Sequence, residues 1–296
     1  MYELIQVGTH TYYIDSPSKV GVYVFDDMHV CLIDSGNDKD AAKKILKHLN
    51  AHNWKLNYII NTHSHADHCG GNAYLQQQTG CKVYCSELDN CFVNHPILEP
   101  SFLFGGYPMK ELKNKFLYAK PSVSEVLPDS LDGLEFIRLD GHSFSMSGIK
   151  TPDGVWFLAD VVSSVDTLEK YAITFLYNVS QHIESLEKLF DLEGTLFIPS
   201  HCSPMKEIRS LAQYNLAKIH ELIEVIKDLC LEPITFEELL KKIFDNYTIT
   251  MNTSQYLLIG DTVKAYLSYL KDKEEMCILF ENNHMFWQSI KSREPF

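Results

Sequence analysis

The chain has 296 residues, of which 45% are hydrophobic, which is enough for one large domain or a main domain with a small one. A formal net charge of −13 disfavours unaided binding to nucleic acid, because such binding depends largely on Lys and Arg contacts to phosphates. No segment has the length and apolarity of a membrane-spanning helix or the pattern of a secretory signal, so we expect a cytoplasmic protein without membrane contact.

Short strand-like runs open the chain, and strands then alternate with helices. Runs rich in β-branched and aromatic residues at 11–15, 20–25 and 29–34 predict strands. Residues 38–53 repeat apolar side chains at helical spacing with lysines between them, which predicts an amphipathic surface helix. The elements expected next are strand 57–60, helix 72–80, strand 81–86, strand 134–139, a short strand near 149–152, strand 155–160, helix 180–190 and strand 195–200.

The stretch from 94 to 129 breaks this alternation. It contains five prolines and the aromatic run SFLFGGYP. A long irregular insertion of this kind is typical of a lid or a binding loop. We therefore treat it as an insertion in the main domain.

The pattern becomes mainly helical after about Pro204. Three helices followed by a hairpin predict a small winged-helix-like domain at 205–296, after a main domain at 1–204. This segment carries 11 Lys and Arg against 14 Asp and Glu, a net charge of −3, whereas nucleic-acid-binding domains are normally basic. For this C-terminal segment, a role in packing, in forming a cleft wall or in a homodimer contact is favoured over RNA binding. The helices are expected at 210–231, 236–246 and 254–270, and the strands at 276–281 and 284–290.

The segment NTHSHADHCGG at 61–71 places three histidines and an aspartate at the end of an apolar strand. Alternate side chains of an extended backbone point the same way, so His63 and His65 can converge on one ion. Asp67 and His68 follow where a helix begins and can hold a second ion beside the first. The alternative is a polar turn with capping roles for Ser64 and Asp67, but four ligand-type residues at this spacing favour a metal site.

Three further candidate ligands each lie just beyond a separate apolar strand: His142, Asp160 and His201. A metal cluster needs more donors than one loop supplies. One strand-end histidine alone is more often a hydrogen-bonded polar group. Ligand groups at the same ends of neighbouring strands, however, face one cleft, where catalytic residues commonly lie.

These residues carry a resemblance to a known family. THSHADH at 62–68, GHS at 141–143, FLAD at 157–160 and PSH at 199–201 resemble the metallo-β-lactamase superfamily, and LIDSG at 32–36 is similar to its early strand and turn. The similarity runs from about Gly21 to Ser203. It implies an α/β fold of the four-layer αββα type, with two β-sheets flanked by helices and a metal pair in a cleft at one edge.

The resemblance also implies a site and a mechanism. Two divalent metal ions would activate a metal-bridging hydroxide for attack on a small-molecule ester, thioester, lactone or phosphodiester, with Asp67 orienting the water. Mixed imidazole and carboxylate donors suit Zn, Fe or Mn, and Zn is the first choice. The implied ligands are His63, His65 and His142 for the first metal, Asp67, His68 and His201 for the second, and Asp160 as the bridge, with Asp34 orienting the ligand loop without touching metal.

The chain departs from some members of that family, and this leaves alternatives open. The carboxylate of Asp160 argues against β-lactam cleavage, since those enzymes usually carry Cys or Ser near that place. After His142 the chain reads SFSMS where the family often has TPGS. An endoribonuclease of the β-lactamase-like winged-helix branch is the main alternative. A mononuclear iron dioxygenase acting on a sulfur substrate is another, and a degenerate binding module is disfavoured because every donor position is present.

Five residues outside the ligand set are candidate substrate contacts. His95, Phe104 and Tyr107 of the insertion either roof the cleft or pack in a satellite core. Tyr171 and Tyr177 follow Asp160, and a hydroxyl there can stabilise a developing oxyanion, although ordinary packing is favoured.

The chain has eight cysteines without CxxC pairs, which predicts reduced thiols rather than a disulfide framework. Cys69 and Cys202 adjoin candidate ligands. Because the seven-residue donor set is complete without them, we interpret both as small buried fillers.

Overall fold

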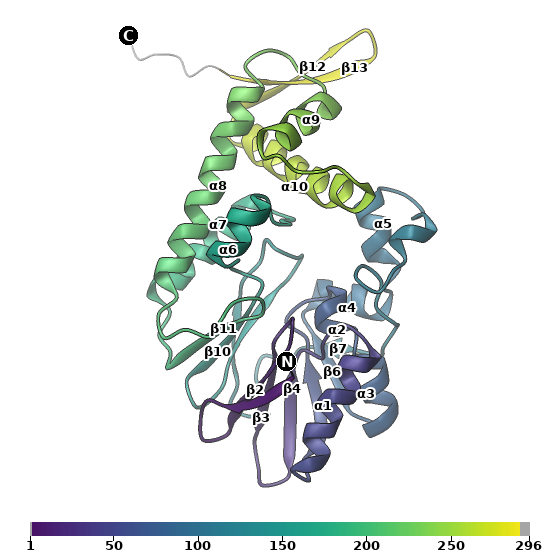
Figure 1. Ribbon diagram of the computed structural model, residues 1–296, viewed down its shortest axis with the longest axis vertical. Coiled ribbons are helices and arrows are strands. Elements are labelled where there is room, and N and C mark those ends of the chain that lie inside the picture. Colours follow the sequence, from purple (N-terminus) through teal and green to yellow (C-terminus); the bar gives the residue numbers. More distant parts are fainter. Residues whose placement is uncertain (1, 291–296) are drawn as a thin grey trace.

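The computed structural model describes residues 2–290 and contains two β-sheets packed face to face (Figure 1). In the seven-stranded sheet the strands lie in chain order. The first four strands pair antiparallel and the last four pair parallel, so β4 to β7 all end at one edge of the sheet. The strands are β1 (Glu3–Gln6), β2 (Thr11–Asp15), β3 (Val20–Val24), β4 (His29–Ile33), β5 (Lys55–Ile60), β6 (Lys82–Cys85) and β7 (Glu125–Val126).

The second sheet has four strands in the order β11-β10-β9-β8. They are β8 (Glu135–Arg138), β9 (Ser147–Lys150), β10 (Val155–Ala159) and β11 (Leu196–Pro199). Side chains of both sheets form one buried cluster that includes Tyr23, Ile33 and Ile60 from the first sheet and Phe157 and Ile198 from the second. This cluster is the interior of the sandwich.

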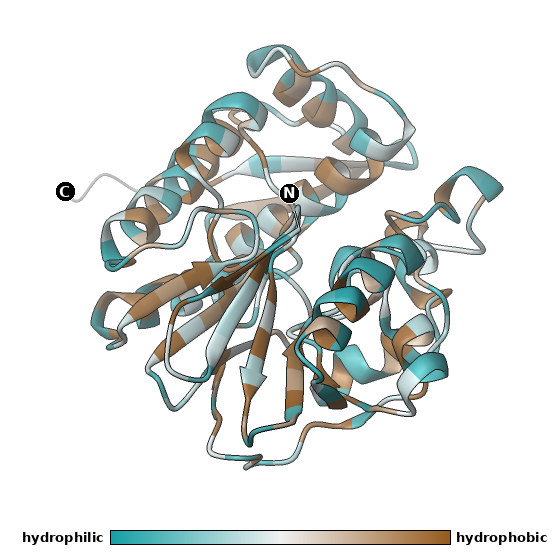
Figure 2. Cartoon of the chain, turned by 60° about the horizontal axis from the view of Figure 1, so that its bottom comes forward, coloured by the Kyte–Doolittle hydropathy of each residue, from teal (hydrophilic) through white to brown (hydrophobic). Residues whose placement is uncertain are grey.

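Helices cover the outer face of the seven-stranded sheet. Helix α1 (Lys39–Ala51) and helix α3 (Asn72–Thr79) bury an apolar stripe against it, with Ile45, Leu49 and Leu75 fully inaccessible. Burying one such side chain contributes about 1.5–3 kcal/mol, so this stripe fixes the position of α1 on the sheet. Figure 2 shows the matching pattern, with hydrophobic residues along the strands and alternating hydropathy along the helices.

Helices also cover the outer face of the second sheet, which completes the four-layer αββα sandwich that the sequence predicts. They are α6 (Val165–Tyr171), α7 (Val179–Lys188) and α8 (Arg209–Leu229). Their buried residues join those of β10 and β11, such as Trp156 and Phe197, in the largest hydrophobic cluster of the described residues.

The C-terminal elements confirm the expected helices and hairpin. They are α8, α9 (Phe236–Asn246), α10 (Thr253–Asp272), β12 (Met276–Glu281) and β13 (His284–Ser289). Their buried side chains, such as Leu240 and Leu267, belong to the same cluster as Trp156 of the second sheet. The C-terminal segment therefore shares a core with the sandwich. A winged-helix classification and a domain boundary at 204 stay predictions.

The insertion at 94–129 is more ordered than the sequence predicts. It contains helix α5 (Leu98–Phe104), a 3-10 turn at Lys110–Leu112 and β7, which extends the parallel part of the first sheet. Helix α5 lies against α10, so the insertion contacts the C-terminal segment above the sandwich. Helix α4 (Glu87–Asn94) precedes it. Among the described residues, each helix is too short or too polar to cross a membrane.

Candidate metal centre

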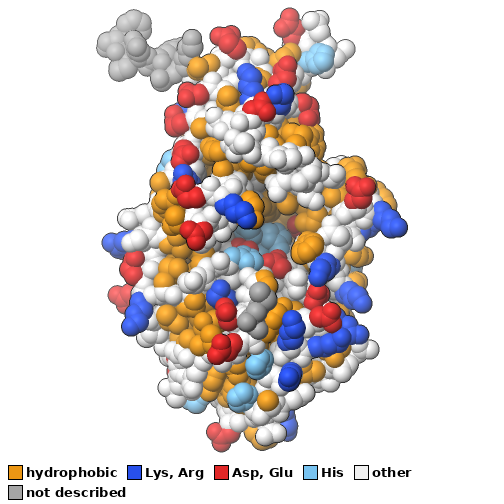
Figure 3. Space-filling model, in the orientation of Figure 1, with side chains coloured by type: hydrophobic (Ala, Val, Ile, Leu, Met, Phe, Trp, Pro, Cys, Tyr) orange, Lys and Arg blue, Asp and Glu red, His pale blue; other side chains and the backbone are white. Residues whose placement is uncertain are grey.

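Side chains with metal-binding groups gather at one edge of the sandwich, where several strands end. Strand β5 leads into His63 and the short helix α2 (Ala66–Cys69). Strand β8 leads to His142, β10 to Asp160 and β11 to His201. Figure 3 shows a hollow in the molecular surface with histidine and acidic side chains at its base. The structure brings all seven predicted ligand residues into two adjoining groups.

The first group consists of His63, His65 and His142, whose candidate ligand atoms lie within 4.8 Å of one another. Nδ1 of His65 is 3.0 Å from Nε2 of His63 and 3.0 Å from Nε2 of His142. Burial lowers the pKa of all three imidazoles, that of His142 to about 4. Neutral imidazole is the form that binds metal. The lowered pKa values therefore favour the metal-binding form of all three side chains.

The second group consists of Asp67, His68, Asp160 and His201. Nε2 of His201 lies 3.2 Å from Oδ2 of Asp67 and 3.3 Å from Oδ2 of Asp160. The Asp160 carboxylate above all raises the pKa of His201 to about 10. Burial alone would lower the pKa of His68, but the nearby carboxylates outweigh it and raise that pKa well above its usual range. Because metal binding must displace these protons, metal affinity is expected to rise with pH.

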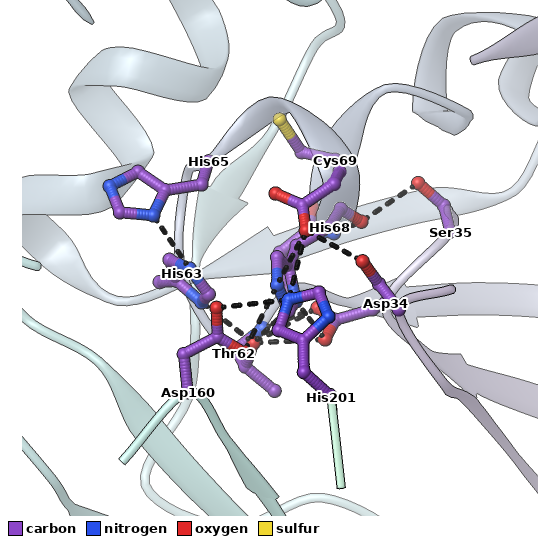
Figure 4. A network of polar contacts seen from close by, with 12 residues as sticks. Asp34, Ser35, Thr62, His63, His65, His68, Cys69, Asp160 and His201 are labelled. Carbon is purple, nitrogen blue, oxygen red and sulfur yellow. Dashed lines mark hydrogen bonds and ion pairs between the residues drawn. The ribbon is translucent and has the colours of Figure 1, made fainter. Parts of the chain in front are cut away.

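Asp160 belongs to the second group and also lies close to the first (Figure 4). Its Oδ2 is 3.6 Å from Nε2 of His142 in the first group and 3.3 Å from Nε2 of His201 in the second. The end of β10 is irregular, since its register with β11 shifts between Phe157 and Ala159 and Ala159 has a φ of 51°. A left-handed conformation costs a non-glycine residue about 1–2 kcal/mol. Backbone strain of this kind clusters at functional sites, and here the strained residue directly precedes Asp160.

Nε2 of His68 and Oδ1 of Asp160 are buried and make no hydrogen bond among residues 2–290, although the two atoms lie 3.4 Å apart as an ion pair. Nearly all buried polar groups in proteins are hydrogen-bonded, so two buried polar atoms that face each other without a hydrogen bond leave bonding capacity unused at the centre. Imidazole nitrogens and carboxylate oxygens converging there are the donors that divalent transition metals bind. The residues fit divalent metal ions.

Asp34, for which the family resemblance implies an orienting role, hydrogen-bonds to the ligand loop. Its carboxylate accepts hydrogen bonds from the backbone N–H of Thr62 at 2.8 Å and from Nδ1 of His68 at 2.8 Å. This fixes His68 with Nε2 facing the centre, which is how buried carboxylates usually hold metal-ligating histidines. Asp34 itself has a φ of 67°, a conformation that Asp and Asn tolerate better than other residues with a Cβ.

Replacing Asp34 with asparagine is expected to weaken metal binding by about 10–100-fold while leaving the chain folded. Asparagine tolerates the left-handed backbone, but its single amide oxygen cannot serve both Thr62 and His68 as the carboxylate does. Titration of metal-free protein with Zn²⁺ measures the change in affinity. Asp228→Asn, at an exposed position on α8, is the matched control. Unchanged affinity in Asp34→Asn would mean that Asp34 has no orienting role.

Three other histidines also have a polar group near the ring nitrogen that faces away from the centre. Nδ1 of His142 lies 3.1 Å from the carbonyl oxygen of Phe175, and Nδ1 of His201 lies 2.9 Å from that of Pro17. Nε2 of His65 lies 3.7 Å from Oε1 of Glu99, whose pKa burial raises to about 8. The two carbonyl partners select the tautomer and the ring orientation of His142 and His201.

Asp89 in α4 lies beside the ligand loops, and the sequence did not point to it. Its carboxylate is fully buried and joins the two ligand loops. Oδ1 accepts the N–H and the hydroxyl of Ser64, between His63 and His65, and Oδ2 accepts the N–H and the hydroxyl of Ser145, close to His142. No motif marks Asp89, because its partners are 25 and 56 residues away in the chain.

The rest of the histidine motif is explained by close packing. A Cβ on Gly70 would lie 2.3 Å from the carbonyl oxygen of Asn37, and one on Gly71 would lie 2.2 Å from that of Ser35. The glycine pair therefore lets α2 and α3 approach the loop after β4. The thiols of Cys69 and Cys202 are buried and donate to backbone carbonyls, as expected for small fillers.

The five candidate substrate contacts do not gather at one place. Tyr177 stacks on Phe144 with ring centroids 3.9 Å apart, next to the loop that carries His142. His95 lines a separate cavity with residues of the insertion. Tyr107 is 79% exposed and Tyr171 and Phe104 are about half exposed, and nothing in the described residues places these three in the centre. The ring of Phe175, a residue that the sequence did not point to, packs edge to face against that of His65, with ring centroids 5.6 Å apart.

The αββα sandwich and this donor set at its edge define a metal-dependent hydrolase. The sequence profile of the metallo-beta-lactamase superfamily matches residues 15–201, and the chain belongs to that superfamily. The match includes all seven candidate ligands and ends at His201.

Individual relatives agree with this assignment. The chain is 22% identical to the probable metallo-hydrolase YqjP of Bacillus subtilis over 94% of this chain and 97% of that protein. It is 46% identical to the hydroxyacylglutathione hydrolase of Methylococcus capsulatus, but over 46 residues that span only 18% of that relative. The crystal structure of a metallo-beta-lactamase family protein from Thermus thermophilus has a TM-score of 0.71 at 19% identity, covering 97% of this chain and 98% of that one.

Proposed function

We propose that the protein is a two-metal hydrolase of a small-molecule ester, thioester, lactone or phosphodiester. The observation that supports this most is Asp160, which belongs to the second group of ligand-type residues and also contacts His142 of the first. One carboxylate in contact with two donor groups suits a pair of cations better than a single one. The 46-residue match to an enzyme named for hydrolysing hydroxyacylglutathione, an acyl thioester, makes thioesters the first class to test.

In this proposal the seven donors hold two cations. His63, His65 and His142 hold the first cation, and Asp67, His68 and His201 hold the second, with Asp160 shared by both. Zn²⁺ is the first choice, and Fe or Mn also suits a set of imidazoles and carboxylates. Two such cations lower the pKa of bound water and polarise the oxygen of the bond to be cleaved.

Asp67 is the residue that the proposal assigns to water orientation. Its side chain is 32% exposed, whereas that of His68 beside it is fully buried, so its carboxylate faces the hollow. The hydroxyl of Ser18 donates to its Oδ2 at 2.6 Å, which leaves the other oxygen to accept a hydrogen bond from an incoming water. Ser18 thereby helps to hold the Asp67 carboxylate in the orientation that this role requires.

The proposal is tested by metal analysis of the purified protein together with a substrate panel. Two metals per chain and hydrolysis of a thioester, lactone, ester or phosphodiester are expected, with activity lost on chelation and restored by Zn²⁺. Removing bound metal is also expected to lower the melting temperature, because a ligand at 1,000 times its Kd stabilises the folded state by about 4.1 kcal/mol.

The same panel separates the alternatives. RNA cleavage with salt-dependent RNA affinity would contradict a small-molecule substrate and support the endoribonuclease alternative. One iron per chain with oxygen uptake on a sulfur substrate would support the dioxygenase alternative. Metal binding without turnover of any substrate would leave only a binding module.

A further inference from the structure

A cavity of about 400 Å³ lies beside the metal centre, between the seven-stranded sheet's helices and the insertion. The start of α1, the segment from the end of α2 into α3, and residues 115–120 of the insertion form its walls. Figure 3 shows Lys and Arg side chains on the side of the hollow where Figure 1 places α1 and α3. Because the chain as a whole is acidic, a local concentration of lysines here is unusual.

Three lysines line this cavity: Lys39, Lys115 and Lys120. One carboxylate, Asp38, also lines it. Asp38 caps α1 by accepting the N–H groups of Asp40 and Ala41, and it pairs with Lys115 at 3.0 Å. Within residues 2–290, no carboxylate lies in salt-bridge distance of Lys39 or Lys120. We call this space the lysine cavity, defined by Lys39, Lys115, Lys120, Tyr74 and Tyr118.

Two tyrosines give the lysine cavity aromatic walls. Tyr74 on α3 and Tyr118 in the insertion are both half-buried, and Nζ of Lys39 lies 5.4 Å from the centroid of the Tyr74 ring. A rigid aromatic surface next to unpaired ammonium groups suits an organic molecule with a negatively charged group. A simple inorganic ion would leave most of a 400 Å³ space unfilled.

The lysine cavity adjoins a second cavity at the metal centre. A second cavity, of about 330 Å³, is lined by Asp67 and His201 of the candidate centre and shares Asn37 with the lysine cavity. Lys115 lines the lysine cavity and the next residue, Phe116, lines the second one. An elongated molecule can therefore place one end against Asp67 and His201 and the other end among the lysines.

We propose that the lysine cavity binds an anionic end of the substrate, a carboxylate or a phosphate, remote from the bond that the metal centre cleaves. This inference rests on the proposed hydrolase function and narrows it to elongated, negatively charged substrates. Ammonium groups attract such an end electrostatically, and the interaction weakens as salt screens it.

The test uses the full-length, metal-loaded protein and three thioesters with the same acyl group. Their thiols are N-acetylcysteamine, which is neutral, glutathione, which carries carboxylates, and coenzyme A, which carries phosphates. The double variant Lys39→Ala/Lys120→Ala is compared with wild type and with Lys47→Ala, an exposed lysine on α1 outside the lysine cavity. Circular dichroism and melting temperature check that each variant is folded.

In the double variant, the ratio of kcat/KM for an anionic thioester to kcat/KM for the neutral one is expected to fall about tenfold, mainly through KM. The Lys47→Ala control keeps the wild-type ratio, and raising the salt concentration lowers the ratio in wild type. Whether the glutathione or the coenzyme A ratio falls identifies the anion as carboxylate or phosphate. An unchanged ratio for both would overturn the proposal.

Binding without turnover separates this inference from the proposed function. S-methylglutathione and S-methyl coenzyme A lack the bond to be cleaved and are titrated calorimetrically into wild type and double variant. Binding of either compound that weakens about tenfold in the double variant supports the lysine cavity even where no thioester is hydrolysed. Equal affinity in both proteins, or no binding to wild type, refutes it whatever the hydrolysis assay shows.

Discussion

Replacing Asp160 with asparagine is expected to abolish hydrolysis and to reduce the bound metal from two ions per chain to at most one. Asp160 is the side chain that contacts both ligand groups, through Nε2 of His142 and Nε2 of His201. An amide keeps one oxygen but loses the negative charge that a shared position between two cations requires. The loss of several kcal/mol of transition-state stabilisation corresponds to a fall in kcat of about 10³-fold or more.

Elemental analysis and steady-state kinetics measure this outcome, with Asp228→Asn as the matched control on the surface of α8. His63→Ala, in the first group alone, is expected to lose metal as well while the chain stays folded. Asp160→Asn with two tightly bound metals and normal kcat would rule out the shared role. The two-metal mechanism would then have no structural support.

The gathering of the candidate ligands could be predicted because these residues follow apolar strands and match motifs of a known family. His63 and His65 alternate at the end of an apolar strand, and Asp160 and His201 each end a run of buried strand residues. Parallel strands end at the same edge of a sheet, so local strand patterns carry information about a site that is assembled from distant segments. Helix α1 was predictable for the same reason, since its apolar stripe repeats at helical spacing.

The parts that could not be predicted depend on contacts between distant segments. Strand β7 consists of two exposed residues, Glu125 and Val126. It is too short for an alternation of apolar and polar side chains to predict it. The shared core of the C-terminal helices and the second sheet has no local signature either. The lysine cavity likewise combines α1, α3 and the insertion, and its lysines belong to no motif in the sequence.

Replacing Asp89 with alanine is expected to lower the free energy of unfolding by about 3 kcal/mol, because buried donors on both ligand loops lose their partner. The N–H groups of Ser64 and Ser145 donate to this carboxylate at 3.0 and 2.7 Å. The same change is expected to weaken metal binding and activity by about 10–100-fold, since the loops that carry His65 and His142 lose their common attachment. Urea unfolding and metal titration below the melting transition measure the two effects separately.

If Asp89 had only a structural role, Asp89→Ala would lower stability without changing the metal affinity of the folded protein. The metal titration therefore distinguishes a positioning role from a packing role. A double-mutant cycle with Ser145→Ala tests the attachment itself. Ser145 donates both its N–H and its hydroxyl to Oδ2 of Asp89, and alanine retains only the N–H. If Asp89 holds the two loops together, the losses in the double variant are smaller than the sum of the single losses, because both changes remove the same hydrogen bond. Strictly additive losses would show that Asp89 and Ser145 act independently, and the link between the two ligand loops would have to come from other residues.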